Sequence, residues 1–547
     1  MMFSDCEKEL LGLLAELPFA DRLDLTALSG WSRGAVYAGM DRLQEGRLVD
    51  AIPHATPLLP PTKRYCLTSR GLLCLADIAA MPQEEMLRRR PVSAQWQRVL
   101  LQRLDALAVI YRLVAAVSNA AFPIRVRLFR AGPVDAAIVL PEGRTVAVVR
   151  QGLTVDRTGF SKRLWRLREG TPPGGLLVLA PDDVRLRQAR RMLTGANFPV
   201  FLGLERDATV AGLDSPVWRP PTVAVDLDLR YILTHLDPRG SLPKESQLTR
   251  HASPVGITSD TRGPDWLLPS VLGPAEKRVL DLVSDWPWVS RRDLAGIMGV
   301  SVRRVAQLVG RLKDMGLVHQ ADDGRHGRLV LSDRGLGLLA RRDRVSVGAA
   351  RRRWSAASLN PPAPLSWRNV SGSRSRQLLR NLDHTSAVHR FLVALCEQAR
   401  AAGWEAVELD PPWRASRYFR YEGRLHSVLP DAFGVLRLGN KTLPFFLEWE
   451  RRAVRPVTMA ARLAPYLRYY SSPRPLDDHG AEPVVLVVFD EELAASHFPR
   501  LARREMDRSG VDVPLRISHR KALEQLGPLG RAWQIPGLWQ PHYAFEG

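Results

Sequence analysis

The apolar residues of the second half of the chain follow a helical period first and a strand period afterwards. Between residues 275 and 315 they recur three and four positions apart, which predicts helices over 275–285, 290–295 and 302–315. Two short apolar runs, 317–318 and 329–331, flank a polar stretch and predict a hairpin. Three helices followed by a hairpin is the order of a winged helix-turn-helix.

Downstream, helical and strand patterns alternate, which indicates an α/β domain. We expect helices over 384–402, 457–470 and 496–509, and strands over 405–409, 427–436, 442–448, 483–489 and 513–518. The Gly439-Asn440 pair predicts a tight turn between two of these strands.

The first half repeats this order. Ser32–Leu43 matches Ser301–Leu312 at a separation of 269 residues, and Val134-Asp135-Ala136 answers Pro430-Asp431-Ala432. We therefore predict an internal duplication. The expected domains are two winged helices at 1–80 and 270–345, two α/β domains at 95–236 and 376–525, and a polar linker at 237–269.

The charge of the chain favours a polyanionic partner. Lys and Arg total 78 against 57 acidic residues, a formal net charge of +21, and double-stranded DNA is the expected ligand. In a winged helix the third helix suits the major groove. The candidate DNA-binding residues are Ser32, Arg33, Tyr37, Arg42, Ser301, Arg303, Arg304, Gln307, Arg311, Arg325 and Arg328. Lys63 and Arg64 lie on the wing side of the first winged helix. The alternative is a winged helix used for protein contacts or dimerisation.

Two acids stand out on the predicted hairpin of the second α/β domain. Asp431 follows Pro430 on one strand, and Glu448 ends the apolar run of the next, with Glu450 two residues on. Adjacent strands would bring Asp431 and Glu448 together as oxygen ligands for Mg²⁺, which could activate water against a phosphodiester. The alternative is that these acids are solvated or paired with local arginines.

This pattern resembles the PD-(D/E)XK nuclease fold, although Glu450 occupies the place of the expected lysine. Arg451 or Arg452 could replace the lysine electrostatically, but arginine does not readily give up a proton. In the first half, Asp135 aligns with Asp431, and Arg150 or Gln151 is expected to answer Glu448, so the first site is predicted to be degenerate. The predicted fold class is α/β (α+β): two winged helix-turn-helix domains, each followed by a PD-(D/E)XK nuclease-like domain.

Residues 275–520 resemble the replication-relaxation family of plasmids and conjugative elements. The resemblance depends on a helix bearing His384 and Arg390, on Leu429–Ala432, on Phe445–Arg451, and on Tyr466–Tyr469. It implies a winged helix before a nuclease-like domain and a role in plasmid replication or DNA relaxation. A tyrosine relaxase mechanism is not expected, because the sequence has no His-x-His pair.

The remaining composition narrows the setting. Four cysteines without Cys-x-x-Cys spacing predict reduced thiols and no zinc site. No apolar run approaches the length of a membrane span, and the first residues do not resemble a signal peptide, so a cytoplasmic protein without a membrane partner is expected.

Three hypotheses stay open. The chain could be a DNA-binding protein in plasmid or conjugative-element replication or mobilisation, a non-catalytic transcription regulator, or a Mg²⁺-dependent endonuclease. Self-association and other mobile-element proteins are further candidate partners. Whether the chain is an enzyme is left open by the missing lysine.

Overall fold

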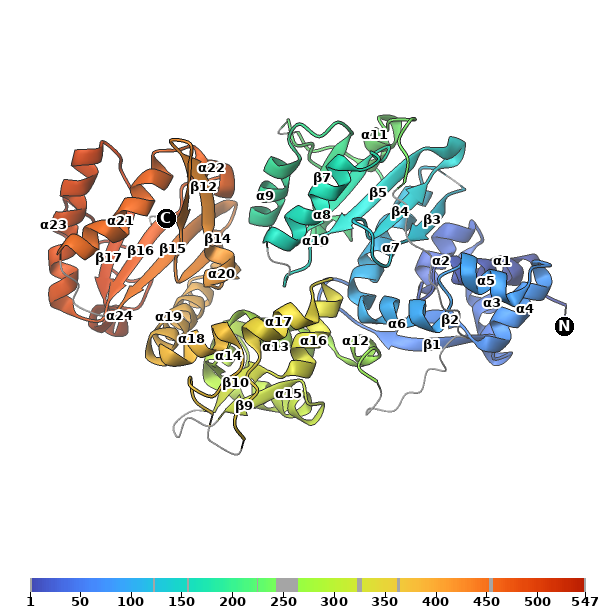
Figure 1. Ribbon diagram of the computed structural model, residues 1–547, viewed down its shortest axis with the longest axis horizontal. Helices are drawn as coiled ribbons and strands as arrows, with labels where there is room; N and C mark the ends of the chain where they lie inside the picture. Colours follow the sequence, from blue (N-terminus) through green and yellow to red (C-terminus); the bar gives the residue numbers. More distant parts are fainter. Residues whose placement is uncertain are drawn as a thin grey trace. The chain divides into compact units, whose positions relative to one another are not determined.

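The computed structural model describes residues 2–121, 123–154, 157–223, 225–242, 264–321, 327–361, 365–451 and 456–545. The chain is of the mixed α/β class and forms two compact units (Figure 1). The first unit comprises Met1–Arg278 and Leu336–Ala350, and the second comprises Val279–Gly335 and Arg351–Gly547. The expected linker, 237–269, falls largely on residues outside the described part, and the predicted domain boundaries stay a prediction.

The first unit begins with three helices and a hairpin, the order of a winged helix. These elements are α1 (Asp5–Glu16), α2 (Arg22–Ser29), α3 (Arg33–Glu45), β1 (Val49–His54) and β2 (Thr62–Leu67). Each helix begins at a side-chain cap: the Ser4, Asp21 and Ser32 oxygens accept backbone N–H groups of the first turn. Four helices follow: α4 (Ser69–Ile78), α5 (Gln83–Arg89), α6 (Ala94–Gln102) and α7 (Leu104–Ser118).

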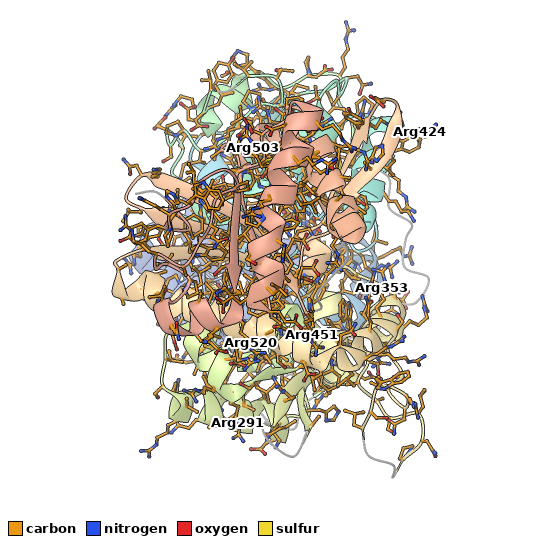
Figure 2. All side chains as sticks on the ribbon, turned by 90° about the vertical axis from the view of Figure 1, so that its left-hand side faces the viewer. Arg291, Arg353, Arg424, Arg451, Arg503 and Arg520 are labelled. Atoms are coloured by element: carbon orange, nitrogen blue, oxygen red, sulfur yellow. The ribbon has the colours of Figure 1, made fainter. Side chains whose placement is uncertain are left out.

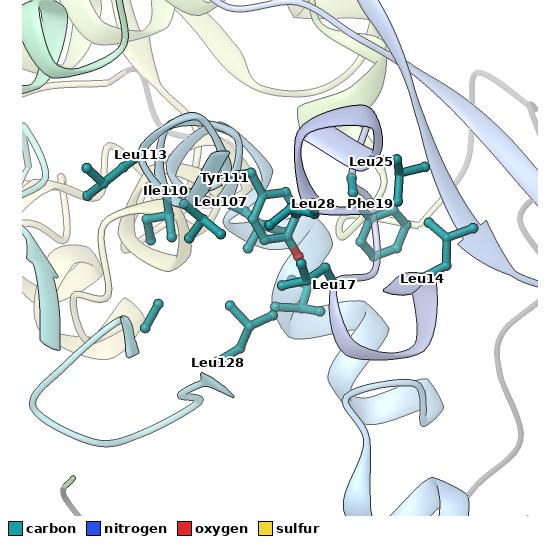
Figure 3. Packing of buried hydrophobic residues seen from close by; sticks show 14 of the residues in the cluster. Leu14, Leu17, Phe19, Leu25, Leu28, Leu107, Ile110, Tyr111, Leu113 and Leu128 are labelled. Atoms are coloured by element: carbon teal, nitrogen blue, oxygen red, sulfur yellow. The ribbon is translucent and has the colours of Figure 1, made fainter. Parts of the chain in front are cut away.

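The apolar residues of this winged helix and of α7 form one core (Figure 3). Tyr111 of α7 is fully buried, and its hydroxyl donates to the Pro18 carbonyl at 2.8 Å. On the same helix, Arg112 pairs with Asp21 at 2.5 Å and with Asp24 at 3.0 Å. The first winged helix and α7 are therefore joined by both apolar packing and buried ion pairs.

The first α/β sheet has five strands in the order β3-β4-β5-β6-β7. The first two pairs are antiparallel and the last two are parallel. The strands are β3 (Arg125–Leu128), β4 (Ala136–Val139), β5 (Thr145–Arg150), β6 (Leu176–Ala180) and β7 (Val200–Leu204). The accompanying helices are η1 (Pro141–Gly143), α8 (Arg157–Glu169), α9 (Asp183–Leu193), α10 (Glu205–Ala208), α11 (Leu229–Thr234) and α12 (Leu268–Val271).

The second three-helix arrangement has a three-stranded sheet in the order β8-β10-β9. Its elements are α13 (Pro274–Asp285), β8 (Val289–Ser290), α14 (Arg291–Met298), α15 (Val302–Asp314), β9 (Val318–Ala321) and β10 (Arg328–Leu331). After it come α16 (Asp333–Arg342), α17 (Val347–Trp354), α18 (Ser373–Arg380) and α19 (Leu382–Ala401). The three predicted helices and the predicted hairpin of this region are confirmed.

The second five-stranded sheet has the order β11-β14-β15-β16-β17, with the same two antiparallel and two parallel pairings as the first. The strands are β11 (Glu405–Asp410), β14 (Ala432–Leu438), β15 (Lys441–Glu450), β16 (Val484–Phe489) and β17 (Leu515–His519). A separate hairpin is made by β12 (Arg417–Tyr421) and β13 (Arg424–Val428). The helices are α20 (Pro412–Ala415), α21 (Pro456–Tyr470), α22 (Arg474–His479), α23 (Glu492–Ser509) and α24 (Arg520–Leu526).

One predicted strand is wrong. The expected strand at 427–436 is two strands, β13 and β14, which belong to different sheets and are separated by Leu429–Asp431. Pro430 has no N–H for a ladder hydrogen bond, so the strand cannot continue through it. The predicted turn at Gly439-Asn440 is confirmed, since Leu438 pairs with Lys441 and Gly439 adopts a positive φ of 58°.

The two winged helices also share rare backbone conformations. Phe19 and Trp288, which are 269 residues apart, are both fully buried and have φ of 70° and 68°. Positive φ at a bulky residue is uncommon. Gly30 and Gly299, at the same separation, have φ of 70° and 69°. The same local folding therefore recurs in both units, while a duplication of the sequence stays a prediction.

The four cysteines are free thiols. Among the residues that the structure describes, no helix is long and apolar enough to cross a membrane.

Candidate nucleic-acid interface and acidic site

The exposed face of α15 is basic. Its buried side consists of Val305, Leu308, Val309 and Leu312, which repeat at helical spacing. This spacing turns Arg303, Arg304, Gln307 and Arg311 to solvent, and all four side chains are exposed. We call these four residues the α15 basic face. The helix as a whole carries four cations and one acid.

Ser301 and Ser32 have a structural task at the helix starts. The Ser301 hydroxyl accepts the Arg304 N–H at 3.2 Å, and the Ser32 hydroxyl accepts the Ala35 N–H at 3.3 Å. Both residues are exposed helix caps, so the structure assigns them first to capping.

The corresponding helix of the first unit, α3, is different. It carries two cations and two acids, Asp41 and Glu45. Arg42 is ion-paired with Glu7 of α1, and the guanidinium of Arg33 lies 5.2 Å from the centre of the Tyr37 ring. The predicted residues Arg33, Tyr37 and Arg42 thus lie on α3, but all three already have intramolecular partners.

The wing residues are only partly described. Arg325 lies outside the described residues. Arg328, at the start of β10, is half-buried and donates to the Trp288 carbonyl at 3.3 Å. In the first unit, Arg64 lies on β2 of the hairpin, but its side chain is fully buried and donates to His54 Nδ1 at 3.0 Å, so it does not face a DNA ligand there.

Asp431 lies at the entry to β14, beside the end of β15. Its N–H donates to the Leu447 carbonyl at 2.9 Å, and its Oδ2 accepts the Trp449 N–H at 2.8 Å. Its other oxygen, Oδ1, lies 2.9 Å from Nε2 of His384, near the start of α19. Two backbone bonds and one imidazole therefore hold the carboxylate in place.

His384 is the residue whose contact with Asp431 the sequence did not reveal. Partial burial disfavours its charged form, but the hydrogen bond and negative charge of Asp431 outweigh this, so the pKa of His384 is raised above its usual value. An imidazolium on Asp431 is thereby favoured. Only the tertiary approach of α19 to β14 creates the pair, and no local spacing predicts it.

Glu448 lies on β15, next to Asp431. The Tyr466 hydroxyl of α21 donates to its Oε1 at 2.5 Å. Burial and the neighbouring charge of Asp431 raise the pKa of Glu448 to about 8, so this carboxyl group holds a proton at neutral pH. The structure thus brings the two predicted acids into electrostatic contact.

Glu450, in the expected place of a lysine, is buried and paired with Arg462 of α21. Arg451 is turned elsewhere, pairing with Asp383 at 3.2 Å, and Arg452 lies outside the described residues. Among the described residues, Arg462 is therefore the cation that lies near both Glu450 and Glu448, where the nuclease pattern would have its lysine.

A cavity of about 290 Å³ adjoins these acids. Five polar side chains contribute to its wall: Ser427, Glu448, Glu450, Arg462 and Tyr466. The rest of the wall is largely apolar. Two carboxylates with room beside them suit Mg²⁺, which keeps several waters and needs only one or two protein carboxylates. Among the described residues, however, no group of three or more His, Cys, Asp and Glu side chains is gathered for a metal ion.

The equivalent place in the first unit is Asp135. Its N–H donates to the Val148 carbonyl at 2.8 Å, and its Oδ2 accepts the Arg150 N–H at 2.7 Å. These bonds match those of Asp431, so Val148 corresponds to Leu447 and Val149 to Glu448. The expectation that Arg150 or Gln151 answers Glu448 is wrong by one or two positions, because the ladder pairs Ala136 with Val148 as it pairs Ala432 with Leu447.

Arginines surround Asp135. Arg163 donates to it at 2.6 Å and Arg344 at 2.7 Å, and although burial opposes ionisation, these charges hold the pKa of Asp135 well below its usual range. The position of His384, third in its helix, is taken by Ala106, third in α7. The first unit therefore has one clamped carboxylate and lacks its two neighbours.

Tyr469 and Tyr470 belong to the packing of α21. Tyr469 is fully buried, and its hydroxyl donates to Asp478 at 3.1 Å. The Tyr470 hydroxyl donates to the Pro483 carbonyl. Both hydroxyls are therefore engaged within the second unit.

Residues 288–485 match the family model described as replication-relaxation. The match covers 198 of the 547 residues, and over this segment the chain is similar to the replication-relaxation family. The replication-relaxation segment contains the α15 basic face, His384, Asp431 and Glu448, and it begins after the whole of the first winged helix and the first sheet. No curated protein and no solved structure matches the chain.

Proposed function

We propose that this protein binds double-stranded DNA through the α15 basic face, and acts in the replication or mobilisation of a plasmid or conjugative element. The observation that carries the proposal is the amphipathic division of α15, whose apolar side is buried while three arginines and a glutamine face solvent. Arginine and glutamine are side chains that bind phosphates and base edges in the major groove. The replication-relaxation match supports the biological setting.

A salt titration tests DNA binding. The Kd for a fluorescent 30-base-pair duplex is measured by anisotropy across a series of salt concentrations. Because binding releases counterions, we expect log Kd to rise steeply with log salt. Absent or salt-independent binding would refute the proposal.

A matched pair of variants locates the contact. Arg303→Ala with Arg304→Ala removes two exposed arginines from α15, and Arg500→Ala with Arg504→Ala removes two exposed arginines from α23. Both variants lose the same charge. Only the α15 variant is expected to weaken binding at least tenfold, since each contact contributes about 1–3 kcal/mol. Equal losses in both would mean that only net charge matters.

Mg²⁺-dependent strand cleavage is a second candidate, supported by the contact between Asp431 and Glu448. Burial and the negative charge of Asp431 raise the pKa of Glu448, and a divalent cation would favour the ionised form of this carboxyl group. Such an ion would polarise a phosphodiester for attack by water: a new P–OH bond forms, the P–O ester bond to the leaving oxygen breaks, and the leaving oxygen takes up the proton released by the water. The Asp431 oxygens are already oriented by His384 and by the Trp449 amide.

Nicking of supercoiled plasmid in Mg²⁺ tests this candidate. The wild type is compared with Asp431→Ala and with Asp135→Asn, the change of the matching residue in the first unit. Nicking that disappears only in the Asp431 variant would support it. No nicking, or nicking that survives Asp431→Ala, would reject this site as a nuclease centre.

A further inference from the structure

Residues 351–382, which we call the arginine connector, run from the end of α17 to the start of α19. They contain seven arginines and no Asp, Glu or Lys. The connector thus carries +7 of the formal net charge of +21 in 32 of the 547 residues. Such a concentration of one sign is costly in a folded chain unless it serves a polyanionic partner.

The connector is folded where the structure describes it. The Gly372 N–H donates to the Ser355 carbonyl at 2.9 Å, and the Ser371 N–H donates to the Ala357 carbonyl at 3.0 Å. A side chain at Gly372 would come within 2.6 Å of the Ser355 backbone, so this close approach requires glycine. Backbone hydrogen bonds therefore join residues 355–357 to residues 371–372, and the connector has a defined conformation around them.

The connector is attached to the second winged helix. Ala356 and Val370 form a buried cluster with Trp288 and with Val330 of β10. All four residues are in the second unit. The arginines are consequently carried on the same body as the α15 basic face.

All seven of these arginines face solvent. They are Arg351, Arg352, Arg353, Arg368, Arg374, Arg376 and Arg380, and Arg353 is labelled in Figure 2. On α18, Arg374 donates to Gln377 at 2.8 Å and Arg376 to the Val370 carbonyl at 3.1 Å. Within the described part of the chain, neither these two nor Arg380 forms an ion pair with a carboxylate. Their charge is therefore not neutralised by the protein.

Trp367 orders two of the cations. Its side chain is 39% exposed, and the guanidinium carbons of Arg368 and Arg380 lie 5.1 Å and 5.5 Å from its ring centre. A cation–π contact positions a guanidinium without removing its charge or its hydrogen-bond donors. Since arginines already lie against the ring, the arrangement suits phosphates better than a stacked base.

We propose that the arginine connector is a second DNA contact, which binds the sugar-phosphate backbone of duplex DNA alongside the site of α15. This inference depends on the proposed DNA-binding function. The connector adds affinity without sequence preference, because phosphate contacts carry no base information.

The test replaces Arg374, Arg376 and Arg380 by glutamine and measures the salt dependence of binding to a 30-base-pair duplex. Each lost phosphate contact lowers the slope of log K against log salt by about 0.9, so the slope is expected to fall by about 2 to 3. The ratio of affinities for two unrelated duplex sequences is expected to stay the same. The control is Arg500→Gln, Arg504→Gln and Arg508→Gln on α23, which removes equal charge from exposed positions and should leave the slope unchanged.

The outcomes separate the two proposals. If the wild type binds with a steep slope and the connector variant has the same slope, the connector inference is overturned and the function of α15 stands. If the wild type does not bind duplex DNA, the proposed function fails. A parallel titration with a single strand of the same sequence checks the commitment to duplex: tighter single-strand binding that the connector variant loses would overturn it. Trp367→Phe, which keeps an aromatic face, should retain more of the slope than Trp367→Ala.

Discussion

The two five-stranded sheets present the same backbone arrangement with different side chains. In each, an aspartate before the second strand donates its N–H to the third strand and accepts an N–H from it. Around Asp431 stand His384 and Glu448, whereas around Asp135 stand Arg163 and Arg344. The first site is thus neutralised by fixed charges, and the second keeps two groups with displaced pKa values. A shared fold therefore supplies the position, and the neighbours decide between structure and chemistry.

The third helices of the two winged helices also differ in charge. The third helix carries a net charge of +3 in the second unit and of zero in the first, from four cations and one acid against two of each. The second unit thus combines a basic helix with a site that can titrate. The first unit combines a neutral helix with a carboxylate that two arginines hold in its ionised form. This combination is typical of a structural scaffold.

The largest expected effect concerns the ion pairs of Asp135 with Arg163 and Arg344. Asp135→Ala leaves two guanidinium groups, each largely buried, without their carboxylate, and breaking a buried ion pair costs about 3–5 kcal/mol. Asp431→Ala leaves one imidazole and the Trp449 N–H without their acceptor and should cost about 1–3 kcal/mol. Urea unfolding of both variants measures the difference. Equal losses would contradict the distinction between the two carboxylates.

The next largest effect compares the two helices. Arg303→Ala with Arg304→Ala should weaken duplex binding tenfold or more, at about 1–3 kcal/mol per contact. Arg33→Ala with Arg42→Ala should change it less than about threefold, because Arg42 is ion-paired with Glu7 and a surface pair contributes at most about 1 kcal/mol. Anisotropy titration at one salt concentration suffices. A larger loss in the α3 variant would make the first unit the main DNA reader.

Much of the fold could be predicted from the sequence because it depends on local periodicity. Val305, Leu308, Val309 and Leu312 define the buried side of α15 by spacing alone, and Gly439-Asn440 marks the turn between β14 and β15. The family resemblance followed from similar short motifs, and the match over residues 288–485 supports it.

The features that could not be predicted depend on tertiary contacts. The pairing of β4 with β5, which makes Val149 the equivalent of Glu448, leaves no trace in a comparison of short motifs. The contact of His384 with Asp431 joins residues 47 positions apart. Arg344 reaches Asp135 from 209 positions away. Charge alone could not show which arginines are exposed, as the buried Arg64 demonstrates.

A pH series should separate Glu448 from Asp135. Glu448 has a pKa of about 8 in the folded chain against a usual value of 4.5, so the unfolded chain releases its proton first as pH rises. Stability should therefore fall between about pH 4.5 and 8, and level off above it. Glu448→Gln should remove this fall and raise stability at pH 8 by on the order of 1 kcal/mol, discounted for partial exposure.

The depressed pKa of Asp135 has the opposite sign. Its contribution is complete at neutral pH and is lost as pH falls through the folded pKa, so Asp135→Asn should flatten only the acid side of the stability profile. Thermal unfolding at pH 5, 7 and 8 measures the Glu448→Gln profile, and further points below the usual aspartate pKa of about 3.9 measure the Asp135→Asn profile. Glu448→Gln that destabilises at pH 8 would show that the carboxyl group is ionised in the native chain.

The smallest expected effect concerns the Tyr466 hydroxyl, which has no equivalent contact at Asp135. Tyr466→Phe removes one hydrogen bond and should cost about 0.5–1.5 kcal/mol. Because this bond favours the ionised form of Glu448, its loss should also move the pH at which stability levels off upward. Tyr470→Phe is the matched control: it lies on the same helix and loses a bond to the Pro483 carbonyl, but makes no contact with Glu448. We expect similar losses of stability in both variants and a displaced pH midpoint only in Tyr466→Phe. A midpoint that moves equally in both would mean that packing of α21, rather than the hydroxyl, controls the proton on Glu448.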